Sequence, residues 1–173
     1  MCSGRWKKGD PQEPADHALG RSRGGFSTKL HLLCDRRGHP LHFYLTAGQA
    51  HESTALLPLL QGADAAIVDG VGASIAWPVA LAGDKGYRAE WIDETLLATG
   101  ITPVIPSRSN EDYDARKVEF DRAKYRDRNI IERLIGWLKE CRRVLTRFDK
   151  KATNYGGFIK MAFVRRYFRI MSI

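Results

Sequence analysis

The sequence has little cysteine and no long hydrophobic run. Its three cysteines, Cys2, Cys34 and Cys141, are widely spaced and form no CxxC pair. This pattern argues against both a disulfide framework and a zinc site. No apolar stretch approaches the roughly 18 residues that span a bilayer, and the N-terminus lacks the hydrophobic segment of a signal peptide. We therefore expect reduced thiols and a soluble, cytoplasmic protein with no membrane partner.

Acidic residues are scarce in the C-terminal third. Of 28 Lys/Arg and 20 Asp/Glu, residues 121–173 hold 15 basic and 5 acidic ones, whereas residues 1–120 hold 13 and 15. The two parts thus carry +10 and −2, within a total of +8. A basic block on predicted helices indicates a polyanionic partner such as DNA, and a merely solvated basic surface is the alternative.

The chain is long enough for one domain with a hydrophobic core. It has 173 residues, 43% of them hydrophobic, which argues against disorder. Alternating and short apolar runs predict four strands, the first two forming a hairpin, at 26–34, 41–48, 79–83 and 101–106. Helical periodicity or capping residues predict helices at 51–63, 88–100 and 154–171. The order of these elements indicates an α/β fold.

Two segments lack periodicity, and the final helix is rich in apolar residues. Residues 1–25 are rich in Gly, Pro and charge, so we expect a flexible basic linker there, and residues 107–124 are expected to form a polar loop. The closing helix is expected to pack its apolar residues on the domain: Phe158, Met161, Ala162, Tyr167, Phe168 and Met171. His31 and His42 lie in predicted strands without other metal-binding residues at ligand spacing, so packed or surface histidines are expected.

Asp84 follows a predicted buried strand. The segment PVALAGDKGY at 78–87 is apolar up to Asp84 and breaks at Gly86. Active-site groups in α/β folds favour the C-terminal ends of strands. An aspartate in this position can equally stabilise a turn or cap a helix, so both interpretations stay open.

Residues Tyr125–Lys139 predict one amphipathic helix with two faces. An apolar stripe includes Ile131, Leu134, Leu138, Cys141 and Leu145. On another face Tyr125, Arg128, Glu132 and Lys139 fall within about 60° of one another. The simpler alternative is a solvated face with an Arg/Glu pair four residues apart, which stabilises a helix by a few tenths of a kcal/mol.

The spacing Tyr, two residues, Arg, three residues, Glu, six residues, Lys resembles the signature of a large group of bacterial insertion-sequence transposases. Three further stretches are similar to the same group: ADHALGRSRGGFSTKLHLLCD, LAGDKGY and RFDKKATNYGGFIKMAF. Together they cover about residues 15–170. The resemblance implies an RNase H-like domain, a mixed sheet flanked by helices, whose Asp-Asp-Glu triad binds divalent metal.

The resemblance also implies residue roles. Asp84 would be the second catalytic carboxylate and Glu132 the third, and both would hold Mg²⁺ or Mn²⁺ in a two-metal site for DNA strand cleavage and strand transfer. Arg128 and Lys139 would bind phosphate near the metal, and Tyr125 would position the DNA backbone. We expect Arg142, Arg143 and Arg147 to bind DNA as well. The implied partners are transposon ends, target DNA and other transposase copies in a homo-oligomer.

One part of the pattern is missing. The family's first catalytic Asp lies on a strand upstream of the linker that resembles residues 1–25, and Asp10, Asp16 and Asp35 follow no suitable strand. We therefore expect residues 26–173 to be a truncated RNase H-like catalytic domain with C-terminal basic helices. It would lack its first, central strand, so the sheet would be split or re-paired, metal binding weak and cleavage absent. The alternatives are a non-catalytic remnant that binds DNA or regulates a transposase, and a small basic structural protein.

Overall fold

The computed structural model describes residues 17–111, 116 and 118–172, which divide into two compact units. Within these residues, unit 1 comprises 17–30, 45–50 and 133–172, and unit 2 comprises 31–44, 51–111, 116 and 118–132. Asp10 and Asp16 lie outside the described residues. Two strands and one helix run from one unit into the other, and each unit is described by itself.

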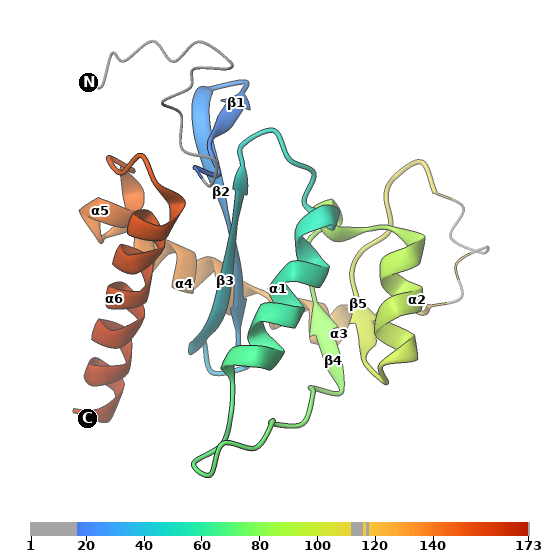
Figure 1. Ribbon diagram of the computed structural model, residues 1–173. Coiled ribbons are helices and arrows are strands. Elements are labelled where there is room, and N and C mark those ends of the chain that lie inside the picture. The colour runs from blue at the N-terminus through green and yellow to red at the C-terminus, as the bar shows by residue number, and fades with distance from the viewer. Residues whose placement is uncertain (1–16, 112–115, 117, 173) are drawn as a thin grey trace. The chain divides into compact units, whose positions relative to one another are not determined.

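The first sheet is formed by three consecutive strands, β1 (Gly20–Ser22), β2 (Gly25–Cys34) and β3 (Pro40–Ala47), in the order β1-β2-β3 (Figure 1). The predicted hairpin at 26–34 and 41–48 is confirmed to within one residue. Strand β1 lies inside the segment predicted to be a flexible linker, and for these residues the prediction is wrong. It pairs antiparallel with the start of β2, and the positive φ of Gly25 (107°) permits the tight turn between them.

Unit 2 contains a second, two-stranded sheet. Helix α1 (Ser53–Ala66) precedes β4 (Ala80–Ala82), the short 3-10 helix η1 (Lys85–Tyr87), α2 (Glu90–Ala98) and β5 (Thr102–Val104). β4 and β5 are parallel. Their connecting helix α2 packs with α1 and the strands in one apolar core, whose buried members are Leu56, Leu60, Ile92, Leu96, Ile101 and Ile105. The predicted strands at 79–83 and 101–106 and the helix ended by Gly100 (φ 76°) are confirmed.

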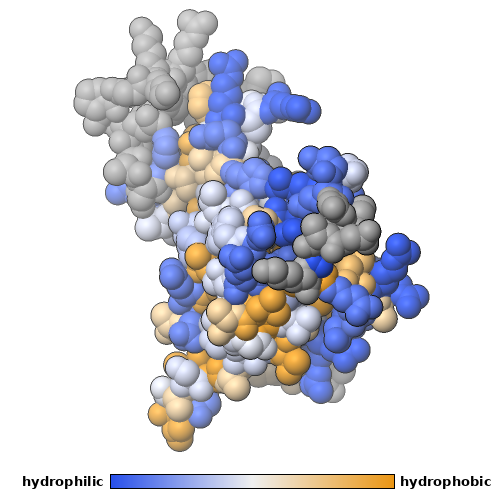
Figure 2. Space-filling view, turned by 90° about the vertical axis from the view of Figure 1, so that its right-hand side faces the viewer, coloured by the Kyte–Doolittle hydropathy of each residue, from blue (hydrophilic) through white to orange (hydrophobic). Residues whose placement is uncertain are grey.

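The described strands form two separate sheets, β1-β2-β3 and β4-β5. The α/β class is therefore confirmed, whereas the loss of a central strand, from which a split sheet was expected, stays a prediction. The more specific expectation, an RNase H-like sheet, stays a prediction. On the face that Figure 2 shows, hydrophilic residues alternate with several separate small apolar areas. Among the helices of the described part, none is both long and apolar enough to cross a membrane.

The predicted single helix over Tyr125–Lys139 is wrong, because it is interrupted at residues 127 and 128. The structure has α3 (Arg122–Arg126) and then α4 (Asn129–Lys139). At the junction, the N–H groups of Asp127 and Arg128 donate to carbonyls three residues back, at 3.1 and 3.0 Å. This tighter 3-10 pattern replaces the α-helical one for a turn.

Unit 1 contains the C-terminal helices. After α4 come α5 (Arg142–Leu145) and α6 (Ala152–Met171), and α5 packs beside α6 (Figure 1). In the predicted apolar stripe Leu134 and Leu138 are buried, but α5 is a separate helix and Leu145 is 59% exposed. The buried face of α6 is formed by Tyr155, Gly156, Ile159, Ala162 and Phe163. Of the six residues predicted to pack there only Ala162 is buried, because the buried stripe follows a different helical face.

Candidate functional site

Asp84 lies just beyond the C-terminal end of β4, as the sequence predicted. Gly83 separates it from the strand, and the N–H of Gly83 extends the pairing by donating to the carbonyl of Val104 at 3.2 Å. Asp84 also caps η1, since its Oδ1 accepts a 2.7 Å hydrogen bond from the N–H of Gly86. The two interpretations of this residue are thus compatible: a capped turn presents an exposed carboxylate at a strand end.

The turn after Asp84 brings a second carboxylate close. A Cβ at Gly86 would lie 2.9 Å from Asp84 Oδ1 and 2.9 Å from Cγ of Glu52, so glycine allows both side chains to approach the turn. The hydroxyl of Tyr87 shares a 2.6 Å hydrogen bond with Nδ1 of His31, which is 3% exposed. Burial, and then the negative charges of Asp84 and Glu52, raise the pKa of Tyr87. Of the two possibilities expected for His31, a packed or a surface histidine, the structure shows the packed one.

Glu132 lies in a cluster with two other residues of the Tyr-Arg-Glu-Lys spacing. Nη2 of Arg128 donates to Glu132 Oε1 at 2.6 Å, and the Arg128 guanidinium lies 5.3 Å from the ring centroid of Tyr125. The Glu132 side chain is 56% exposed. Although the helix is broken just before α4, the three side chains still meet, because Arg128 contacts both its neighbours across the break.

The predicted DNA-binding cations after Glu132 belong to unit 1. Lys139, at the end of α4, and Arg142, at the start of α5, are exposed. Arg143 is exposed too, and its guanidinium carbon lies 4.9 Å from the ring centroid of Phe158 and 6.0 Å from that of Phe148. These three cations are therefore accessible on the surface of unit 1.

Arg147 differs from the other cations because all three of its guanidinium nitrogens bind protein oxygens. The acceptors are the carbonyls of His17, Ala18, Asp149 and Lys150 and the hydroxyl of Thr28. The guanidinium also lies 5.3 Å from the ring centroid of Tyr155. A phosphate could reach Arg147 only by displacing these contacts, so the structure favours a structural role over the predicted DNA contact.

Asp84 and Glu132 are the right kind of ligand for a divalent metal ion, but two carboxylates are fewer ligands than such a site needs. Asp84 and Glu132 offer carboxylate oxygens, the donors that Mg²⁺ and Mn²⁺ prefer, and each has one oxygen outside its hydrogen bond described above. Among the described residues, however, no three His, Cys, Asp or Glu side chains are grouped so that they could hold a metal ion. Asp35 is engaged in its hairpin turn, where its carboxylate accepts from the N–H groups of Arg37 and His39.

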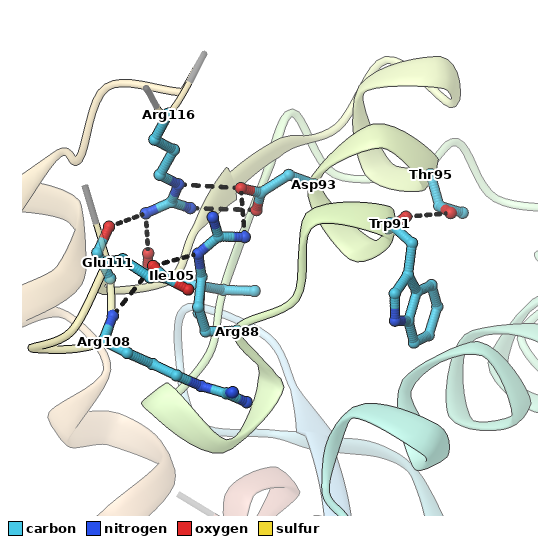
Figure 3. Close-up of polar contacts among 9 residues, drawn as sticks. Arg88, Trp91, Asp93, Thr95, Ile105, Arg108, Glu111 and Arg116 are labelled. Carbon is cyan, nitrogen blue, oxygen red and sulfur yellow. Dashed lines mark hydrogen bonds and ion pairs between the residues drawn. The ribbon is translucent and has the colours of Figure 1, made fainter. Parts of the chain in front are cut away.

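Unit 2 also holds a buried ion cluster that sequence reasoning missed (Figure 3). Arg116 donates from Nε and Nη2 to the two carboxylate oxygens of Asp93, at 2.9 and 3.1 Å. Nη1 of Arg88 lies 3.1 Å from Asp93 Oδ2, an ion pair without the alignment of a hydrogen bond. Nε of Arg88 donates to Glu111 Oε2 at 2.9 Å. Two cations and two anions thus compensate one another.

The cluster connects the segment after β5 to the start of α2. Nη1 of Arg116 donates to the carbonyl of Ile105 at 2.7 Å and to the hydroxyl of Ser107 at 3.1 Å. Partial burial would raise the pKa of Glu111, but hydrogen bonds from the Arg108 N–H and the Arg88 guanidinium outweigh it and lower that pKa. Among the described residues of the predicted loop at 107–124, Ser107, Arg108, Glu111 and Arg116 are therefore held by hydrogen bonds and ion pairs that no local pattern in the sequence signals. The loop prediction is wrong for residues 122–124, which belong to α3.

Comparison with known proteins places the chain among transposases. The family profile described as "Transposase DDE domain" matches residues 5–165. The transposase for insertion sequence element IS402 of Burkholderia cepacia is 33% identical over 142 residues, which is 82% of this chain and 62% of that protein. The chain thus spans less than two thirds of that relative. The transposase for insertion sequence element IS6501 of Brucella ovis is 32% identical over 136 residues, covering 79% of this chain and 94% of the relative.

No solved structure matches the chain. The family profile nevertheless covers nearly the whole sequence, and the second relative is matched along almost its entire length. The chain belongs to the DDE-domain family of insertion-sequence transposases.

Proposed function

We propose that the chain binds DNA and contributes Asp84 and Glu132 to metal-dependent cleavage and strand transfer of transposon DNA. The observation that carries this proposal is the Tyr125, Arg128 and Glu132 cluster. A carboxylate that is 56% exposed is oriented by a guanidinium and has one oxygen outside that pair. An accessible, oriented carboxylate is what a cation and a phosphodiester would require.

In this proposal the cations bind phosphate and the carboxylates bind the metal ion. Arg128 orients Glu132 through Nη2 and uses its other N–H donors for phosphate, while Tyr125 supports the guanidinium from its ring face. Lys139, Arg142 and Arg143 bind the DNA backbone by charge. A divalent ion bound at the carboxylates would supply Lewis-acid activation of the attacking oxygen and stabilise the leaving oxygen.

A second function, DNA binding without cleavage, is favoured by one observation. The described residues contain no group of three side chains that could hold a metal ion. Two carboxylates alone would bind Mg²⁺ or Mn²⁺ weakly, because hard cations are held tightly when several oxygen ligands converge. In that case the chain would contact DNA or another transposase copy, and cleavage would need a further carboxylate supplied on an added strand.

DNA binding is tested by fluorescence anisotropy over a range of salt concentrations. The basic residues should make affinity fall steeply with salt, and replacing Arg142 and Arg143 by Ala should lower the slope of log K against log[salt] by about one per lost phosphate contact. Arg37→Ala is the matched control, since Arg37 is an exposed cation in the β2–β3 turn. An equal effect of control and test variants would place the interface elsewhere.

Cleavage is tested with Mg²⁺ or Mn²⁺ on DNA that carries the ends of the matching element. The chain is assayed alone and after fusion to an N-terminal strand that carries an additional Asp. Cleavage that appears only with the added strand and disappears in Glu132→Gln supports the assignment of Glu132. Cleavage by the chain alone would show that a residue already present completes the site. Activity that survives both Asp84→Asn and Glu132→Gln would refute the proposed carboxylates.

A further inference from the structure

The loop between α5 and α6 exposes an aromatic ring on a basic surface of unit 1. Phe148 is 63% exposed, and Leu145, at the end of α5, is 59% exposed. The segment from residue 142 to residue 151 also carries four exposed cations, Arg142, Arg143, Lys150 and Lys151, and one acidic residue, Asp149. Exposed apolar side chains surrounded by charge are the composition of a binding surface for an anionic ligand with apolar parts.

The exposed ring is held in place. Residues 147 and 149 flank Phe148, and Arg147 donates from Nε to the carbonyl of Asp149 at 2.8 Å and from Nη2 to that of Lys150 at 2.7 Å. The same guanidinium binds the carbonyls of His17 and Ala18, so the loop is tied to the N-terminal part of unit 1. The side chain before Phe148 and the two carbonyls after it are thus held by hydrogen bonds, so the loop presents the Phe148 ring to solvent in a defined position.

Arg143 supplies a positive charge next to that ring. Its guanidinium carbon lies 6.0 Å from the centroid of Phe148 and 4.9 Å from that of Phe158, within range of cation–π attraction to both rings. Among the described residues Arg143 has no acidic partner. The two rings restrict the guanidinium while its N–H donors stay available to a ligand.

We propose that Phe148 and Arg143 form a stacking site for an unpaired nucleobase of DNA. Phosphate alone would need only the cations, whereas an exposed ring beside a guanidinium can also stack on the face of a base, which every base offers once it leaves the duplex. A fully paired duplex hides those faces, so the site selects unpaired or flipped bases such as those at strand ends. This inference rests on the proposed DNA binding of unit 1 and specifies its ligand.

The test compares two 20-base-pair duplexes, one fully paired and one with a single unpaired adenine, by fluorescence anisotropy at fixed salt. The wild-type chain should bind the duplex with the unpaired base at least about fivefold more tightly, since stacking on an aromatic side chain contributes at least that factor. Phe148→Leu should lose this preference and keep its affinity for the paired duplex. Phe148→Tyr, which retains a ring, should keep the preference.

Replacing adenine by 2-aminopurine at the unpaired position gives a second readout, because its fluorescence is quenched when the base stacks. Quenching by wild type and Phe148→Tyr but not by Phe148→Leu supports the site. A preference or quenching that survives in Phe148→Leu, or a wild type that binds both duplexes equally, overturns it while leaving the proposed DNA binding intact. Failure of the wild type to bind either duplex would instead overturn the proposed function together with this site. A thermal melt checks that the Leu variant is folded.

Discussion

Unit 2 contains two clusters built from the same residue types, Arg with Asp or Glu, in opposite environments. In the buried cluster the side chains of Arg88, Asp93 and Arg116 are 8%, 7% and 5% exposed. In the surface cluster the side chains of Arg128 and Glu132 are 25% and 56% exposed. The surface hydrogen bond, at 2.6 Å, is even shorter than the buried ones, at 2.9–3.1 Å, so bond length does not mark the cluster that supports the fold.

This difference in exposure determines whether the charged side chains support the fold or can bind a ligand. In the buried cluster Asp93 compensates two guanidinium groups, and removing it would leave cations in a site with little water. In the surface cluster water replaces any lost partner at small cost. The first cluster is therefore committed to the fold, whereas the second can exchange its partner for a ligand.

The largest expected effect is that of Asp93→Asn. The substitution keeps the volume but removes the anion between Arg88 and Arg116, so the free energy of unfolding should fall by about 3–5 kcal/mol. Urea denaturation followed by circular dichroism measures this. Glu94→Gln is the matched control, since Glu94 is the exposed neighbour on α2 and should change stability by less than about 0.5 kcal/mol. A loss under about 1 kcal/mol for Asp93→Asn would contradict the structural role of the cluster.

The next largest loss of stability is expected for Arg147, in contrast to the exposed arginines of unit 1. Arg147→Lys keeps the charge but loses the planar fork that binds four carbonyls and a hydroxyl, so we expect a loss of about 1.5–3 kcal/mol. Arg142→Lys, at an exposed position, should be within about 0.5 kcal/mol of wild type. Both are measured by urea denaturation. Equal stability of the two variants would return Arg147 to the group of DNA-binding candidates.

Tyr87 lies near Asp84 in the chain, and its replacement is expected to lower the free energy of unfolding by an intermediate amount that depends on pH. Tyr87→Phe removes the hydrogen bond with His31 and should cost about 1 kcal/mol near neutral pH. Burial raises the pKa of Tyr87 above its ordinary value of 10.0. Wild type should therefore hold its full Tyr87 contribution below about pH 10 and lose it at higher pH, because ionisation favours the unfolded chain.

The measurement is the urea midpoint of both proteins at about pH 8 and about pH 10.5. The stability difference between wild type and Tyr87→Phe should shrink at the higher pH, and the variant itself supplies the control for the other tyrosines. A constant difference would mean that Tyr87 ionises in the folded protein as readily as in the unfolded one.

The smallest effect is expected in the surface cluster. Arg128→Ala removes an exposed ion pair four residues apart, which contributes about 0.3–0.5 kcal/mol. Thermal melts in low and high salt should show a small difference that salt reduces further. A destabilisation above about 1 kcal/mol would mean that this cluster, like the buried one, is part of the fold's support.

Local patterns in the sequence predicted much of the fold. Strict alternation predicted the β2–β3 hairpin, short apolar runs predicted β4 and β5, and a glycine marked the end of α2. These features depend on neighbouring residues, so periodicity and turn chemistry reveal them. Spacing alone also grouped Tyr125, Arg128 and Glu132, since residues three and four apart meet on any nearly helical backbone.

Tertiary structure decided which charges are buried. Arg88 and Glu111 are 23 residues apart, and Arg147 and Ala18 are 129 apart. The sequence predicts a DNA contact for Arg147 and singles out none of Arg88, Glu111 and Ala18, because partners so distant in sequence are chosen only when the chain folds. The closeness of Glu52 to the Asp84 turn has the same origin. The break at Asp127 and Arg128 opposes the amphipathic period, and the 3-10 hydrogen bonds that form it were not signalled by any pattern in the sequence.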